Sequence, residues 1–242
     1  MIPSVGALSG RDFLDVADLD AAELRELLDL AHAIKAGRRT GRPLEGQHIA
    51  LLFQKPSHRT RVSFEVGIGR LGGRATSLSE HDVQLGVRET VGDAARVLDS
   101  YVDGVVARLR SHRDLLELAA TSEKPVINAL TNRSHPCQIL ADLMTLEEVC
   151  GPLPGQKLVY IGDGNNIAVS LIEASELMGF SLTVITPPGY APPAGIVDGN
   201  LKAERGGSGV TLSSDVADAA RATAIYTDVW ASMGQESERE VR

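Results

Sequence analysis

Aromatic residues are scarce in this sequence. They make up 4% of its 242 residues, so a surface for stacking nucleic-acid bases is not expected. Basic residues are not in excess either, because 24 Lys and Arg stand against 32 Asp and Glu, and the net charge of -8 argues against a nucleic-acid-binding protein. No apolar run approaches the roughly 18–20 residues that cross a bilayer, and the N-terminus lacks the pattern of a secretory signal, so no membrane partner is expected.

Cysteine is also rare, with only Cys137 and Cys150 present. Two cysteines cannot build a disulfide framework or a four-cysteine metal site, and His135 has no second His or carboxylate at ligand spacing. We therefore expect a soluble protein of a reducing compartment, the cytoplasm, with no bound metal. Apolar residues make up 43% of the chain, which is enough for a buried core.

Helix and strand patterns alternate along the first part of the chain. Residues 19–36 have apolar positions at the helical period, with Asp20 and Glu23 as a capping box and Gly37 after the last turn. This alternation predicts a mostly parallel sheet with helices on both faces. The other predicted helices here are residues 61–71, 90–101, 114–120 and 137–150, and the predicted strands are residues 47–53, 75–78, 103–107 and 125–128.

The segment 151–155, Gly-Pro-Leu-Pro-Gly, is the strongest boundary signal, because two prolines flanked by glycines break any helix. The alternation then restarts. We predict an α/β protein of two domains, residues 1–150 and 151–242, each a mostly parallel sheet flanked by helices, and the second Rossmann-like. The predicted elements of the second domain are strands at residues 157–161, 181–186, 209–212 and 224–228, a helix that ends at Gly179, and helices at residues 198–205 and 215–220.

The residues after the strand 47–53 combine features of an anion-binding site. Ser57, Arg59 and Thr60 stand before or at a helix start, where free N–H groups and partial positive charge are exposed. The hydroxyls add donors and Arg59 adds a guanidinium fork, so this segment is expected to bind phosphate or carboxylate. The alternative is an ordinary capped helix with solvated arginines.

Further polar residues follow two other predicted strands. Arg108 stands at a strand end, where ligands bind in open α/β sheets, and the alternative is a surface arginine. His135 is able to polarise a carbonyl group and Gln138 to hydrogen-bond a ligand, whereas the alternative is a histidine that caps a helix. Cys137 is interpreted as a small buried residue rather than a nucleophile.

The second half carries a weaker set of candidates. GDGNN at residues 162–166 lacks the last glycine of a dinucleotide fingerprint, because Ile167 stands there, so a nucleotide cofactor is not expected. Asn165 and Asn166 either face a polar ligand or cap the next helix. Asp228 ends a predicted strand, where its carboxylate suits a ligand ammonium or caps the following turn.

Taken together, these segments resemble the aspartate/ornithine carbamoyltransferase family, and most closely its ornithine-specific branch. KPSHRTRVSFE is similar to the family's carbamoyl-phosphate loop, although Thr, Leu or Met is commoner at the position of His58. SHPCQILADLMTLEE is similar to its His-Pro-x-Gln motif, and GDGNN and DVWASMGQE are similar to its amino-acid-binding segments. The resemblance extends over nearly the whole chain in the family's order.

The resemblance implies transfer of a carbamoyl group from carbamoyl phosphate to the δ-amine of L-ornithine, giving L-citrulline and phosphate in arginine metabolism. It implies no metal or organic cofactor, a homotrimer or a multiple of trimers, and catalytic roles for Arg108, His135 and Thr60. Gln84, in a segment that alone reads as a turn, would reach a neighbouring subunit's site. Carbamoyl phosphate would be bound by Ser57, His58, Arg59, Thr60, Gln84, Arg108, His135 and Gln138, and ornithine by Asn166, Asp228, Ser232 and Met233.

The chain departs from the family pattern at its end. Family members continue with a strand ending in His-Cys-Leu-Pro, a later Arg and a final helix, so we expect an incomplete second domain with an unpaired edge at residues 224–228. A catalytically impaired subunit is therefore one alternative. The others are a transcarbamoylase for another amine, such as putrescine or an acylated ornithine, and, less favoured, a nucleotide-dependent oxidoreductase.

Overall fold

The computed structural model describes residues 8–196 and 209–228, which belong to two compact units. Unit 1 is formed by Met1–Asp15 and Asp29–Cys137, and unit 2 by Val16–Leu28 and Gln138–Arg242. The helix that precedes the Gly-Pro-Leu-Pro-Gly segment therefore belongs, from Gln138 onward, to unit 2. The domain boundary near residue 151 stays a prediction. It was placed at a helix-breaking segment of the sequence, whereas the two units are defined by contacts within the folded chain.

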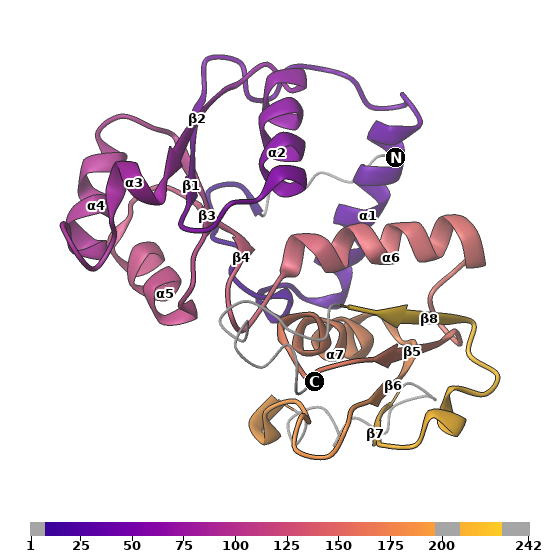
Figure 1. The fold of residues 1–242 in the computed structure, drawn as a ribbon. Coiled ribbons are helices and arrows are strands. Elements are labelled where there is room, and N and C mark those ends of the chain that lie inside the picture. Colours follow the sequence, from indigo (N-terminus) through magenta and orange to yellow (C-terminus); the bar gives the residue numbers. More distant parts are fainter. Residues whose placement is uncertain (1–7, 197–208, 229–242) are drawn as a thin grey trace. The chain divides into compact units, whose positions relative to one another are not determined.

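Unit 1 contains a parallel sheet with the strand order β2-β1-β3-β4 (Figure 1). This confirms the predicted alternation of strands and helices, since each parallel neighbour requires a crossover connection. The strands are β1 (His48–Phe53), β2 (Arg74–Ser79), β3 (Gly104–Arg108) and β4 (Val126–Leu130), and the helices are α2 (His58–Arg70), α3 (Glu80–Val83), α4 (Val91–Asp99) and α5 (His112–Thr121).

Both faces of this sheet are buried, as expected for parallel strands. Ala50 and Leu52 of β1 belong to the core that α4 and α5 cover, whereas Leu51 and Phe53 belong to a second core that contains Ile68 of α2. Successive residues of a strand point to opposite faces, so one apolar run supplies both cores. Figure 1 shows α2 on one side of the sheet and α4 and α5 on the other.

Unit 2 contains a second parallel sheet, with the strand order β7-β6-β5-β8. Within the described ranges β8 is an edge strand, and its Ile225 is 57% exposed. The predicted helix 215–220 is a 3-10 helix, η3 (Val216–Ala219), and the predicted helix 198–205 lies outside the described residues. The other elements are α6 (Pro136–Cys150), α7 (Asn166–Met178), the 3-10 helix η2 (Val16–Asp18), β5 (Lys157–Ile161), β6 (Ser181–Ile185), β7 (Val210–Ser213) and β8 (Ala224–Thr227).

The helix ends follow the predicted signals closely. Helix α1 (Ala21–Lys35) has a capping box, in which the Asp20 N–H donates to Glu23 Oε2 at 3.0 Å and the Glu23 N–H donates to Asp20 Oδ1 at 2.8 Å. Helix α7 is buried along almost its whole length and ends at Gly179, whose φ of 70° is the left-handed conformation that glycine adopts readily. No helix in the described part of the chain is both long and apolar enough to cross a membrane.

We predict that Leu115→Ala lowers the free energy of unfolding of unit 1 by about 2–5 kcal/mol, because Leu115 of α5 is 0% exposed in the core and its truncation leaves a cavity. The adjacent Leu116 is 48% exposed, so Leu116→Ala is the matched control and should change stability by less than about 1 kcal/mol. Urea denaturation followed by circular dichroism measures both changes. Equal effects would contradict this description of the core.

Candidate active site

The N-terminus of α2 is free to receive an anion. The helix begins at His58, three residues earlier than predicted, which makes Ser57 its N-cap. The Ser57 side chain makes no cap hydrogen bond, and the first turn contains no acidic residue. The first N–H groups of such a helix have no intrahelical acceptor, and a helix N-terminus of this kind can stabilise a phosphate or carboxylate. His58 and Arg59 are exposed, whereas Thr60 is half-buried.

Arg108 lies beside this helix start, because the last residue of β3 pairs with Phe53, the last residue of β1. The Arg108 Nη1 is 3.5 Å from Thr60 Oγ1. Burial lowers the pKa of the guanidinium, and its buried Nε has no hydrogen-bond partner in the described part of the chain. A buried guanidinium with a spare donor is costly by itself and is stabilised by an anionic ligand.

A local irregularity of the sheet occurs at the same residue. The register between β3 and β4 shifts there, so that Ala107 pairs with Asn128 but Arg108 pairs with Leu130. One residue of β4 is therefore left over, as in a β-bulge. Bulges of this kind change the direction of a strand and of the side chains that follow it. The shift separates Arg108 from the regular ladder at the edge of the sheet where ligands bind.

His135 directly precedes α6 and is 8% exposed. Burial, reinforced by the positive charge of Arg108, lowers its pKa to about 4. The imidazole is therefore neutral at pH 7, with one nitrogen as a donor and the other as an acceptor. A neutral donor next to a fixed positive charge is suited to polarising a carbonyl group while adding no second charge to the site.

Gln138 belongs to unit 2. The Gln138 Nε2 donates to Asp142 Oδ1 at 2.9 Å, one turn later in α6. The pKa of Asp142 is raised to about 6, mainly by burial and in addition by the charge of Asp228. Hydrogen bonds from Gln138 and Tyr226 act in the opposite direction and lower it. Sequence reasoning missed Asp142 and Tyr226, although the four-residue spacing from Gln138 places Asp142 on the same helix face.

In the predicted amino-acid-binding segments, Asn165 caps a helix and Asp228 remains a ligand candidate. Asn165 caps α7, because its Oδ1 accepts from the Ile167 N–H at 2.9 Å, and its Nδ2 donates to Asp228 Oδ2 at 3.1 Å. Asn166 follows it in the first turn and is 9% exposed. Asp228 is thus held at the carboxyl end of β8. Ser232 and Met233 lie outside the described residues.

Gly164, the second glycine of the GDGNN segment, has a steric role. A Cβ at Gly164 would lie 2.3 Å from the backbone nitrogen of Pro192, so a side chain is excluded there. The Gly164 N–H donates to the Tyr190 carbonyl at 2.8 Å. The GDGNN segment therefore needs its second glycine for the close packing of two backbones.

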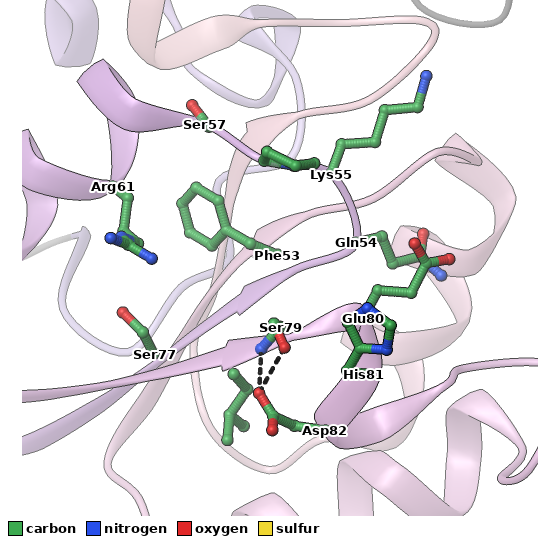
Figure 2. A pocket seen from close by; sticks show the side chains of 12 residues that line it. Phe53, Gln54, Lys55, Ser57, Arg61, Ser77, Ser79, Glu80, His81 and Asp82 are labelled. Atoms are coloured by element: carbon green, nitrogen blue, oxygen red, sulfur yellow. Dashed lines mark hydrogen bonds between the residues drawn. The ribbon is translucent and has the colours of Figure 1, made fainter.

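A pocket of ≈ 400 Å³ lies on the other side of the α2 start, between β1, β2 and α3 (Figure 2). Both acidic residues of the pocket have nearby partners: Glu80 forms an ion pair with Arg110 at 2.6 Å, and Asp82 accepts from the Ser79 N–H at 2.6 Å. The pKa of Asp82 is lowered mainly by the hydrogen bond from the Ser79 hydroxyl and, second, by the one from the Ser79 N–H. Of the predicted ligands only Ser57 lines this pocket. The lining residues are Phe53, Gln54, Lys55, Pro56, Ser57, Arg61, Ser77, Leu78, Ser79, Glu80, His81 and Asp82.

Gln84 has a different environment from the other predicted ligands. It is the C-cap of α3 and has a left-handed backbone with φ 48° and ψ 50°. It does not line the pocket beside Ser57. The segment predicted as a turn is thus partly helical, and the role of Gln84 in a neighbouring subunit's site stays a prediction.

Cys137 is not activated for nucleophilic chemistry. Burial raises the pKa of its thiol to about 12, so the thiolate is absent at neutral pH. The Sγ–H donates to the Asn128 carbonyl at 3.4 Å. The thiol therefore serves packing, as interpreted from the sequence.

Comparison with known proteins places the two halves of the chain in one family. Residues 11–148 match the family model for the aspartate/ornithine carbamoyltransferase carbamoyl-P binding domain, and residues 154–242 match the model for the Asp/Orn binding domain. The chain is 48% identical over 240 residues to an ornithine carbamoyltransferase of Symbiobacterium thermophilum, covering 97% of this chain and 77% of that protein. It is 47% identical over 243 residues to the anabolic enzyme of Pyrococcus furiosus, covering 98% and 77%.

Solved structures agree with these matches. The ornithine carbamoyltransferase structure from Pyrococcus furiosus superposes with a TM-score of 0.92 at 46% identity, over 97% of this chain and 77% of that one. The structure of an anabolic ornithine carbamoyltransferase from Campylobacter jejuni gives a TM-score of 0.88 at 35% identity, over 96% and 77%.

The fold is that of an α/β protein with two parallel-sheet units, and in unit 1 Arg108 lies beside the N-terminus of α2. The chain belongs to the aspartate/ornithine carbamoyltransferase family.

We predict that Asp142→Asn stabilises the protein at neutral pH. The pKa of Asp142 is raised from 3.8 to about 6, so the folded state holds the proton more tightly and loses stability as pH rises between these values. Well above pH 6 the penalty is on the order of 3 kcal/mol, and the asparagine variant avoids it.

Differential scanning calorimetry from pH 4.5 to 8 tests this prediction. The gain in melting temperature should be largest at pH 7–8 and shrink as pH falls toward 4.5. Glu148→Gln, which removes an exposed carboxylate from the same helix, is the matched control and should show no such trend. A gain that grows toward low pH would show that the sign is wrong.

Proposed function

We propose that this chain catalyses carbamoyl transfer from carbamoyl phosphate to the δ-amine of L-ornithine, giving L-citrulline and phosphate. The observation that carries the proposal is the placement of Arg108 next to Thr60 and the α2 N-terminus, with the neutral His135 under the influence of its charge. These donors suit both ends of an acyl phosphate. The ornithine carbamoyltransferases to which the chain is similar support this choice.

Carbamoyl phosphate is proposed to bind with its phosphate at the start of α2. Ser57, His58, Arg59 and Thr60 would supply backbone and side-chain donors, and His58 would contribute mainly its N–H. Arg108, His135 and Gln138 would hold the carbamoyl group, and Gln84 would approach the phosphate from a neighbouring subunit. Two negative charges on a phosphate are stabilised by these N–H groups and by the helix dipole.

The reaction then follows from the donors. The unprotonated δ-amine attacks the carbonyl carbon, a C–N bond forms, and the carbonyl electron pair moves to the oxygen. Arg108, His135 and Thr60 stabilise this oxyanion, the electrostatic effect that usually dominates acyl transfer. The C–O bond to phosphate breaks, phosphate leaves toward Arg59, and the amine gives up its proton to phosphate or solvent. No metal or organic cofactor enters these steps.

Ornithine is proposed to bind through Asn166, Asp228, Ser232 and Met233. The Asp228 carboxylate, oriented by Asn165 at 3.1 Å, suits the α-ammonium of the substrate. We also propose a homotrimer in the cytoplasm. Similarity to the family supports the trimer, and the free cysteines Cys137 and Cys150 are in keeping with a reducing compartment.

Arg108→Gln tests the oxyanion role. Removing one donor of this kind typically lowers kcat by about 10²–10³-fold, and we expect a loss of this size in citrulline formation. Arg110→Gln is the matched control, because Arg110 is exposed and paired with Glu80, and it should change kcat by less than about twofold.

Carbamoyl-phosphate binding is measured on the same variants by calorimetry, with Arg59→Ala as a further variant that should bind more weakly. A chain that neither forms citrulline nor binds millimolar carbamoyl phosphate would contradict the proposed function.

A panel of amine acceptors and one substitution test the second substrate. Ornithine should be carbamoylated in preference to putrescine and N-acetylornithine. Asp228→Asn should raise the KM for ornithine about tenfold or more, because a charge-assisted hydrogen bond is lost, with little change in the KM for carbamoyl phosphate. Asp218→Asn, an exposed carboxylate of the same unit, is the control. Preference for another amine would replace ornithine in the proposal.

A further inference from the structure

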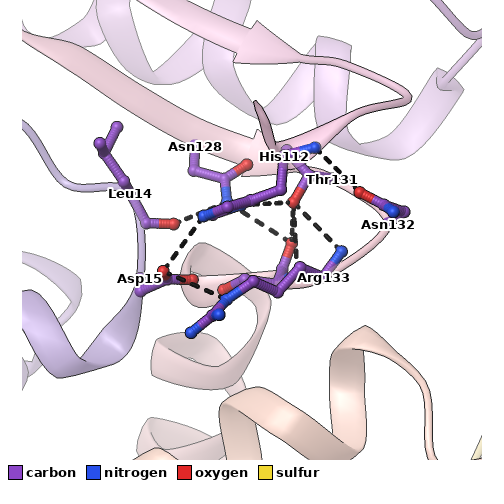
Figure 3. A network of polar contacts seen from close by, with 8 residues as sticks. Leu14, Asp15, His112, Asn128, Thr131, Asn132 and Arg133 are labelled. Carbon is purple, nitrogen blue, oxygen red and sulfur yellow. Dashed lines mark hydrogen bonds and ion pairs between the residues drawn. The ribbon is translucent and has the colours of Figure 1, made fainter. Parts of the chain in front are cut away.

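A buried polar network holds the loop that leads to His135. The loop consists of residues 131–134 and connects β4 to α6. Thr131 and Ser134 are both 0% exposed, and the Thr131 N–H donates to the Ser134 carbonyl at 2.9 Å. Figure 3 shows that the network joins this loop to residues from the chain start, from α5 and from β4.

The Thr131 hydroxyl is the centre of the network. Its oxygen accepts from the Ser134 N–H at 3.3 Å and from the Arg133 N–H at 3.4 Å. A hydroxyl oxygen has two lone pairs, so these two N–H groups fill its acceptor capacity. The hydroxyl hydrogen is then left to donate, and His112 Nδ1 at 3.0 Å is closer than the Ser134 carbonyl at 3.5 Å.

This pattern determines the tautomer of His112. If Nδ1 accepts from Thr131, the ring proton is on Nε2, which is 3.3 Å from Asp15 Oδ2. The His112 backbone N–H donates to Asn132 Oδ1 at 2.9 Å, so the same residue holds the loop at a second point. Thr131, His112 and Asp15 thus form a chain of donors and acceptors that runs in one direction.

Asp15 is well suited to end this chain. Burial alone would raise its pKa, but hydrogen bonds from the His112 and Ser134 side chains and the charge of Arg133 leave the pKa below its usual value. The carboxylate is therefore ionised at neutral pH. Arg133 Nε lies 3.5 Å from the same Oδ2, which adds a further tie to the loop.

Asn128 strengthens the attachment from the sheet side. Its Nδ2 donates to the Leu14 carbonyl at 2.7 Å and is 3.5 Å from the Ser134 carbonyl. The loop before His135 is thereby held from the chain start as well as from β4. Such a connected set of buried polar groups favours a single loop conformation, although the Oδ1 of Asn128 has no hydrogen-bond partner in the described part of the chain.

We propose that Thr131, His112 and Asp15 are positioning residues that fix the imidazole of His135 beside Arg108. They do not touch the reacting atoms. The catalytic meaning of this role rests on the proposed function, in which His135 polarises the carbamoyl carbonyl. The positioning itself is a property of the folded chain and is measurable without turnover.

The first test is an NMR titration of the His135 imidazole, identified by its loss in His135→Gln. In the parent its pKa should be about 4. Thr131→Val keeps the volume of the side chain but removes the hydroxyl, so His135 should gain hydration and its pKa should rise by at least about one unit toward 6.5. Thr131→Ser restores the hydroxyl and should restore the low pKa.

Two further variants keep the test decisive. Asp15→Asn preserves the side-chain shape but removes the charge that ends the chain, and it carries the test if Thr131→Val does not fold. Thr183→Val, at a buried threonine of β6 in unit 2, is the matched control and should leave the His135 pKa unchanged. A folded Thr131→Val or Asp15→Asn variant with an unshifted His135 pKa would overturn the proposal.

The kinetic readout separates positioning from stability. Thr131→Val should lower kcat for citrulline formation at least about tenfold, while the KM for ornithine changes less than about twofold, since displacement of a catalytic group acts on the transition state. A variant that is destabilised but keeps kcat and the His135 pKa shows a structural role only. If the parent forms no citrulline, the proposed function fails, and the titration still decides the positioning.

Discussion

The pairing of β1 with β3 is the constraint on which the rest of the site depends. Their parallel register places Phe53 opposite Arg108, so the loop that leads to α2 and the guanidinium of Arg108 start from the same sheet edge. The register is fixed by two buried faces, because a slip of one residue would exchange the sets Ala50 with Leu52 and Leu51 with Phe53 between their cores. The placement of Arg108 beside the α2 start thus follows from hydrophobic burial on the two faces of the sheet.

The electrostatics of the site depend on a positively charged Arg108 next to a neutral His135 imidazole. Arg108 stays cationic despite its burial, whereas the same burial and the charge of Arg108 hold the pKa of His135 at about 4. Two cations there would repel each other, and the uncharged imidazole avoids this cost while it keeps a donor. The buried Nε of Arg108 has no hydrogen-bond partner in the described part of the chain, a cost that an incoming anion would relieve.

Sequence patterns predicted most strands and helices of both units, because the periodic spacing of apolar residues is a local signal. Capping residues are local signals too, as at Asp20 before α1 and Gly179 after α7. The patterns misplaced the starts of α2 and α3, and they could not give features that depend on non-local contacts. The start of α2 was placed at Arg61, since nothing local distinguishes Ser57 as the N-cap. Residues 81–86 were interpreted as a turn, although Ser79 and Asp82 form a capping box at the start of α3. The bulge at Arg108 and the network around Thr131 depend on register and tertiary approach, which no single segment encodes.

Asp142 of the second unit accepts a hydrogen bond from Gln138, although burial raises its own pKa to about 6. A buried carboxylate is unfavourable, and the nearby charge of Asp228 makes it more so. A hydrophobic residue would avoid both effects but would leave the Gln138 amide free to rotate. With its Nε2 donating to Asp142, the amide presents Oε1 as its acceptor on the other side. Asp142 also hydrogen-bonds Tyr226, and the charge of Asp228 raises its pKa. The hydrogen bond that orients Gln138 is therefore coupled to the charge at the end of β8. A ligand ammonium at Asp228 would therefore lower the cost of ionised Asp142 and strengthen its hydrogen bond to Gln138.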